Sequence, residues 1–197
     1  MKKNITKNKL LSSLIFLILI TSIIGLITPS IIPKKNKKEI TNNILVLKEN
    51  IKKNSLKKPI NILKQNIISN IILIIIIWLI GISIIGIPSN LLLYLYKVFI
   101  LSLEISFLII NIKQLNILFI IIYIIPNIIS LFLLFILIYY SIKYSIMLIN
   151  LLFLKKEYPI KKITQQYTKI MLLIIFSIFI ETILETILIP KLLSYIL

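Results

Sequence analysis

The chain has 197 residues, of which 59% are hydrophobic and 15% charged, and its formal net charge is +17. A mean hydropathy of +1.06 excludes a soluble globular domain of this length and indicates an integral membrane protein. Because cysteine and histidine are absent, disulfides, thiol nucleophiles, haem and most zinc sites are excluded, and no metal or cofactor is expected. The positive charge comes from lysines in the tail and loops, not from a folded basic face interleaved with aromatics, so nucleic-acid binding is not expected.

The N-terminus combines a short basic tail, residues 1–9, with an apolar run over residues 10–32. This run is longer than the apolar region of a typical signal peptide, and no small-residue cleavage site follows it. We therefore expect a permanent transmembrane anchor, with a signal peptide as the alternative.

The sizeable polar segment of the chain covers residues 33–65 and carries ten lysines against two glutamates. Within it, apolar residues recur at helical spacing, at Ile40, Ile44, Leu47 and Ile51. This pattern predicts an amphipathic helix that lies on the membrane or on a partner. A solvated, lysine-rich loop is the alternative.

Residues 66–111 form an apolar run about twice as long as the ~20 residues that cross a bilayer as a helix. We therefore expect two spans folded back on each other, over residues 67–86 and 89–111. The corner is predicted at Gly86 and Pro88, because a left-handed glycine closes a helix and a proline cannot continue it. Either Ser89 or Asn90 is expected to cap the second helix.

Two charged residues, Lys97 and Glu104, lie inside the second of these spans. Their spacing of seven residues is two helical turns, which places them on one face but roughly 10 Å apart along the axis. Direct pairing is therefore not expected. An unpaired charge at mid-bilayer costs at least ~3 kcal/mol, so each needs a partner on another helix, water, or a path to the interface.

Residues 115–150 are again longer than one perpendicular span, and Pro126-Asn127 interrupts them. The proline removes one backbone hydrogen bond, and the Asn127 side-chain amide can donate to the carbonyl that is left without a partner. A kinked long helix is one interpretation. The other is a short half-helix followed by a full span. Further along, Tyr139, Tyr140 and Tyr144 would mark a membrane interface, and Lys143 among them fits the same depth.

A basic loop, residues 155–169, precedes the last span, which is expected over residues 170–195. Glu181 and Glu185 lie one turn apart inside it. Two carboxylates at this spacing disfavour joint ionisation in a low dielectric, so one is expected to be protonated or paired with Lys97. A structural contact between helices is the preferred interpretation, and a proton relay is the alternative.

Together these segments predict an all-α integral membrane protein with about five transmembrane helices, a tight hairpin between the second and third, and a broken or kinked fourth. An N-terminal anchor would precede a four-helix membrane domain over residues 66–197. The sequence has no glycine-rich phosphate loop and no H-E-x-x-H, G-x-S-x-G or C-x-x-C pattern, so we do not expect an enzyme. Lysines are nearly balanced between the two sides, so the positive-inside rule assigns no orientation.

The hairpin carries a specific motif. Asn70 is followed, after seven residues, by the stretch W-L-I-G-I-S-I-I-G-I-P, which includes Trp78, Gly81, Gly86 and Pro88. It resembles the N-x7-W-L-x-G-x-S-x-x-G-x-P hairpin of the stage II sporulation protein M family, polytopic membrane proteins of endospore-forming bacteria. Further similar elements are Lys97 after the hairpin, Pro126-Asn127, and Glu185 with Pro190. The chain departs from the family at Val98 and Ser102, which stand where relatives have glycines.

The resemblance implies a noncatalytic scaffold in the cell membrane, at the septal or engulfing membrane of sporulating cells. Such a scaffold would hold two peptidoglycan-degrading partners, stage II sporulation proteins D and P. The segment 33–65 would then be the recruiting surface, with its lysines also drawn to anionic wall polymers.

Two other functions are open from the residues alone. One is a small transporter or permease subunit that uses the broken helix and the intramembrane charges of Lys97, Glu104, Glu181 and Glu185. The other is a holin-like pore former, which fits less well because such proteins usually have fewer spans.

Overall fold

The computed structural model describes residues 2–33, 59–110, 117–155, 158–184 and 186. Its elements are five helices: α1 (Lys2–Ile31), α3 (Pro59–Gly81), α4 (Gly86–Ile110), α5 (Ile117–Leu154) and α6 (Ile160–Ile183). All five are long and apolar enough to cross a membrane, and no strand occurs among the described residues. The predicted fold class is therefore confirmed.

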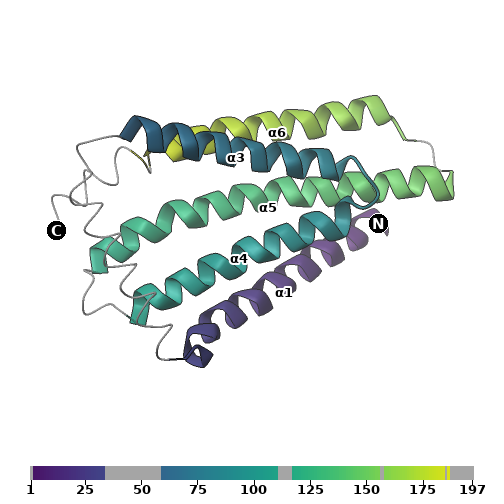
Figure 1. Cartoon of the computed structure of the whole chain (residues 1–197). Coiled ribbons are helices and arrows are strands. Elements are labelled where there is room, and N and C mark those ends of the chain that lie inside the picture. Colours follow the sequence, from purple (N-terminus) through teal and green to yellow (C-terminus); the bar gives the residue numbers. More distant parts are fainter. Residues whose placement is uncertain (1, 34–58, 111–116, 156–157, 185, 187–197) are drawn as a thin grey trace.

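The first helix, α1, begins at Lys2, so the basic tail is helical and continuous with the apolar anchor over Leu11–Ile31. It lies alongside α4, which is its main neighbour (Figure 1). The closest approach is at Gly25, where an added Cβ would lie 2.7 Å from the Ser102 Cβ and 2.8 Å from the Phe99 carbonyl oxygen. Ser106 Oγ also donates a hydrogen bond to the Leu26 carbonyl at 2.9 Å. Small residues thus fix α1 against α4.

The hairpin between α3 and α4 is present, but its corner differs from the prediction. The helix α3 ends at Gly81, the turn covers residues 82–85, and Gly86 and Pro88 lie in the first turn of α4. No described glycine has a positive φ, so the predicted left-handed Gly86 is wrong. A proline within the first turn costs no hydrogen bond, because that amide has no partner in the helix.

The fourth span, α5, runs without interruption across Pro126-Asn127, so the half-helix alternative is wrong. Lipid-embedded helices tolerate an internal proline when neighbouring groups satisfy the freed carbonyl. The helix ends at Leu154, and Lys155 closes it with a left-handed φ of 48°. With 38 residues α5 is about 57 Å long, and it extends beyond the α3–α4 turn (Figure 1).

The last helix, α6, begins at Ile160, ten residues before the predicted start. The lysines and glutamines of its first two turns were expected in a loop. They are exposed instead on a helix that continues past the hydrocarbon layer. The segment 33–65 lies largely outside the described residues, but its last residues, from Pro59, belong to α3.

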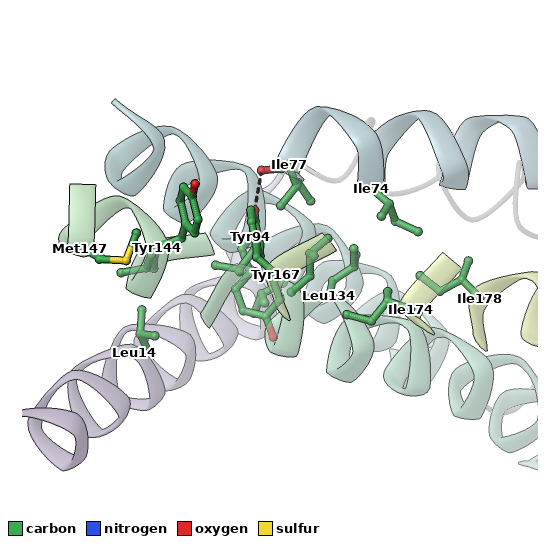
Figure 2. Packing of buried hydrophobic residues seen from close by; sticks show 14 residues of the cluster. Leu14, Ile74, Ile77, Tyr94, Leu134, Tyr144, Met147, Tyr167, Ile174 and Ile178 are labelled. Atoms are coloured by element: carbon green, nitrogen blue, oxygen red, sulfur yellow. Dashed lines mark hydrogen bonds between the residues drawn. The ribbon is translucent and has the colours of Figure 1, made fainter. Parts of the chain in front are cut away.

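The helix α5 is central and packs against α3, α4 and α6. Its buried residues Leu134, Leu137 and Ile138 meet Ile74 and Ile77 of α3, with Ile174 and Ile178 of α6 completing the core (Figure 2). The outer faces are apolar as well: Phe132, Leu173 and Phe176 are 62%, 67% and 64% exposed. Such a surface is stable only in contact with lipid or another protein, which fits a multi-pass membrane protein.

Candidate functional site

The hairpin is bonded to the rest of the bundle by buried side chains. Asn90, which is fully buried, donates from Nδ2 to the Ile77 carbonyl at 3.0 Å and to Ser141 Oγ at 2.6 Å. Ser145, one turn after Ser141, donates to the Gly81 carbonyl at 2.9 Å. Asn90 was expected to be a candidate helix cap, but it joins α4 to α3 and α5. The bond from Ser145 satisfies the Gly81 carbonyl, one of the last four carbonyls of α3, which have no partner within the helix.

Both glycines of the hairpin motif are buried at close contacts. A Cβ on Gly81 would collide with Ser141 Oγ and the Tyr167 hydroxyl. A Cβ on Gly86 would collide with the Ile80 carbonyl oxygen and lie 2.8 Å from Ser145 Oγ. Both glycines therefore allow neighbouring groups to approach the backbone closely. We call the interlocked residues Gly81, Gly86, Asn90, Ser141, Ser145 and Tyr167 the hairpin lock.

Aromatic rings close the hairpin lock from α6. The ring of Tyr167 stacks on Trp78 with centroids 6.2 Å apart and on Tyr144 with centroids 5.2 Å apart. Its hydroxyl reaches the Ile77 and Trp78 carbonyls at 3.5 and 3.3 Å, the first drawn as the dashed line in Figure 2. The motif tryptophan is thus half-buried in an aromatic stack, whereas Pro88 is exposed.

A polar cavity of about 270 Å³ lies among α3, α4, α5 and α6, away from the hairpin turn. Its polar lining residues are Asn66, Ser69, Asn70, Lys97, Glu104, Asn127, Ser130 and Glu181. Its apolar floor includes Leu101, Leu134 and Ile178, which are buried. One water occupies ~30 Å³, so the space holds several waters or a small polar group.

The cavity contains four of the five intramembrane polar residues predicted from the sequence. Lys97 and Glu104 line it from α4 and attract each other electrostatically. Asn127 lines it from α5 and Glu181 from α6. The pairing of a glutamate of α6 with Lys97 stays a prediction. Glu185 lies outside the described residues. Whether any of these side chains acts in function stays a prediction.

A comparison with known protein families shows to which family the chain belongs. The sequence profile of SpoIIM, stage II sporulation protein M, matches residues 13–190. The chain belongs to the stage II sporulation protein M family. In this member the match begins within α1 and includes every described residue of the hairpin lock and the polar cavity. No curated protein and no solved structure gave a significant match to the chain.

Several residues of this SpoIIM-family chain were not singled out from the sequence. They are Asn66, Ser69 and Ser130 of the cavity, and Ser141, Ser145 and Tyr167 of the hairpin lock. One signal was available, because isolated Asn and Ser residues within apolar spans usually face other helices. Asn70 shows the point: its Nδ2 donates to Thr182 Oγ1 at 3.2 Å and links α3 to α6.

Proposed function

We propose that this protein is a noncatalytic membrane scaffold for sporulation engulfment, which recruits peptidoglycan-degrading partners to the septal or engulfing membrane. Membership of the stage II sporulation protein M family supports a sporulation-related membrane role. Within that role, the proposed partners are stage II sporulation proteins D and P.

The observation that carries the proposal is the way the bundle holds the segment between α1 and α3. The end of α1 is fixed to α4 at Gly25 and by the Ser106 to Leu26 bond. The helix α3 is fixed to α5 through the hairpin lock and to α6 through Asn70 and Thr182. The end of α1 and the start of α3 lie at the same end of the bundle (Figure 1).

A braced bundle suits a scaffold, because a surface held at both ends loses less conformational entropy when a partner binds. The segment contributes ten lysines, at positions 34, 35, 37, 38, 48, 52, 53, 57, 58 and 64. Positive charge of this density attracts acidic protein surfaces and anionic wall polymers and speeds their encounter.

The test replaces these ten lysines with glutamine in the full chain at unchanged length. We expect weaker co-purification of stage II sporulation proteins D and P from sporulating cells. A matched control replaces Lys155, Lys161 and Lys162, which lie near the opposite end of the bundle, with glutamine. Unchanged co-purification with the ten-site variant, or equal loss with the control, contradicts the proposal.

The polar cavity favours a second candidate, a small transporter or permease subunit. Lysine, glutamate and asparagine side chains gathered inside a membrane bundle are typical of solute or ion pathways. The other premise of this candidate, a broken helix at Pro126, is not met because α5 is continuous. Glu104→Gln and Glu181→Gln distinguish the two candidates in proteoliposomes. Loss of a measured ion or solute flux with intact folding favours transport, whereas unchanged partner capture and no flux in the parent protein favour the scaffold.

A further inference from the structure

The mouth of the polar cavity lies on the side of the bundle. Of its described lining residues, Ser69 of α3 and Lys97 of α4 are exposed, whereas the others are buried or partly buried. Lys97 is eleven residues from the start of α4 and thirteen from its end, about 17 Å and about 20 Å along the axis. The mouth therefore opens between α3 and α4 near the middle of the span.

The hairpin lock explains why this opening exists. Close contacts of Gly86 with the Ile80 carbonyl oxygen and Gly81 hold the start of α4 against the end of α3. Away from the turn the two helices diverge, and α5 lies between them (Figure 1). The space left at the diverging ends is lined by amide, hydroxyl and charged groups instead of being filled by large apolar side chains.

The charges in the cavity select the type of ligand. Lys97 provides a cation and Glu104 an anion on one face of α4, two turns apart, or roughly 10 Å. The Glu181 carboxyl group of α6 lines the same cavity and adds a second acidic group to it. A simple anion would meet the Glu104 carboxylate, and a simple cation would meet the Lys97 ammonium. A ligand that carries both charges pairs with both groups and adds no net charge to a low-dielectric region, where net charge is costly.

We infer that the cavity binds a zwitterion made of a phosphate and a primary ammonium, with Lys97 facing the phosphate and Glu104 facing the ammonium. Ammonium N–H groups and phosphate oxygens are also complementary to the amides of Asn66, Asn70 and Asn127, which both donate and accept. Two sources supply this chemistry: the headgroup of phosphatidylethanolamine entering sideways from the bilayer, or a free phosphoethanolamine-type solute entering from water.

The mouth on the side of the bundle admits the lipid source as well as the soluble one, because the acyl chains can stay in the hydrocarbon layer while the headgroup enters between α3 and α4. Ligand binding in this cavity is independent of partner recruitment, so either can fail without the other.

The experiment titrates short-chain phosphatidylethanolamine and short-chain phosphatidylglycerol into the purified full-length protein and counts bound lipid by native mass spectrometry. We expect the zwitterionic lipid to bind at least tenfold more tightly than the anionic one. Lys97→Gln and Glu104→Gln should each weaken that binding at least tenfold. Lys143→Gln is the matched control, since Lys143 is exposed on α5 above the Tyr140 ring and outside the cavity. It should bind like the parent.

Competition with free phosphoethanolamine separates the two sources. Displacement of the lipid at comparable concentration assigns the site to the soluble zwitterion, and no displacement assigns it to the lipid. Two results overturn the inference in favour of a simple anion site. One is equal binding of both lipids, and the other is loss of phosphatidylethanolamine binding in Lys97→Gln with no loss of binding in Glu104→Gln.

A second readout needs no variant and so does not depend on how the variants fold. A hydrophobic carbodiimide modifies membrane carboxyl groups, and peptide mass spectrometry locates the modification at Glu104. Saturating short-chain phosphatidylethanolamine should slow modification of Glu104 at least fivefold, whereas phosphatidylglycerol should not. An unchanged rate in both lipids overturns the inference.

Discussion

The Asn90 side chain donates a 2.6 Å hydrogen bond to Ser141 Oγ and so joins the first turns of α4 to the middle of α5. Both residues are fully buried. The same amide also donates to the Ile77 carbonyl, so a single side chain holds three helices together at the hairpin. The stability of the bundle should therefore depend on this contact more than on any exposed polar residue.

Replacing Asn90 with leucine tests this dependence. The change removes the two hydrogen bonds that the Asn90 amide donates, to the Ile77 carbonyl and to Ser141 Oγ, and hydrogen bonds between membrane helices contribute about 1–2 kcal/mol. We expect a destabilisation of at least this size in thermal unfolding of the detergent-solubilised protein. The control is Ser177→Ala, because Ser177 bonds only within its own helix, to the Leu173 carbonyl. A destabilisation no larger than that of the control contradicts the assignment.

A methyl group on Gly81 should be poorly tolerated. Its Cβ would collide with Ser141 Oγ and with the Tyr167 hydroxyl, so α3 must move away from α5 and α6. Overpacking of this kind costs about 1–3 kcal/mol. We expect Gly81→Ala to lower the unfolding temperature, whereas Ile85→Ala, in the exposed turn, should change stability by less than about 0.5 kcal/mol. Equal effects of the two changes would show that Gly81 is not at a tight contact.

The ring of Tyr167 should matter more than its hydroxyl. The Tyr167 hydroxyl bonds to the Ser141 side chain, and its bonds to the Trp78 and Ile77 carbonyls, at 3.3 and 3.5 Å, are long. The residue is 2% exposed, and its ring stacks on two aromatic side chains. We expect Tyr167→Phe to cost less than about 1 kcal/mol and Tyr167→Ala about 3–5 kcal/mol. Fluorescence of Trp78, the single tryptophan of the chain, reports the same difference. A phenylalanine variant as unstable as the alanine variant contradicts this order.

The packing of the anchor on the bundle depends on Gly25. A leucine at this position would overlap Ser102 and the backbone of α4 at Phe99, so α1 should separate from α4. We expect Gly25→Leu to reduce the unfolding temperature and to weaken partner co-purification, because one end of the polar segment is then released. The neighbouring exposed Leu26→Ala is the control. If Gly25→Leu and the control behave alike, α1 acts only as a membrane tether.

Much of the fold could be predicted from composition and from the hairpin motif, because long apolar runs admit few alternatives in a bilayer. The turn between α3 and α4 was predicted at the wrong residues, because glycine and proline occur both at the end of one helix and at the start of the next. The real constraint at Gly81 and Gly86 is contact with Ser141, Ser145 and Tyr167, residues from 55 or more positions away in the chain. No local pattern reveals such contacts.

The start of α6 was missed, and a continuous α5 was only one of two interpretations left open. Lysines and glutamines were assigned to a loop, although a helix remains favourable after it leaves the hydrocarbon layer. Pro126 was given the breaking effect it has in water, although tertiary contacts offset it within a membrane bundle. The cavity was foreseen in part: Lys97, Glu104, Asn127 and Glu181 were recognised as intramembrane polar residues, but their shared location depends on how four helices pack.

We propose that this protein holds partner proteins at the membrane, and a capture experiment tests this most directly. Full-length protein reconstituted in liposomes is incubated with purified stage II sporulation proteins D and P, and bound protein is measured after flotation. We expect both partners to float with liposomes that contain the parent protein, and neither with liposomes carrying the variant in which the ten lysines of residues 34–64 are glutamines. Failure of the correctly folded parent protein to retain either partner would contradict the account.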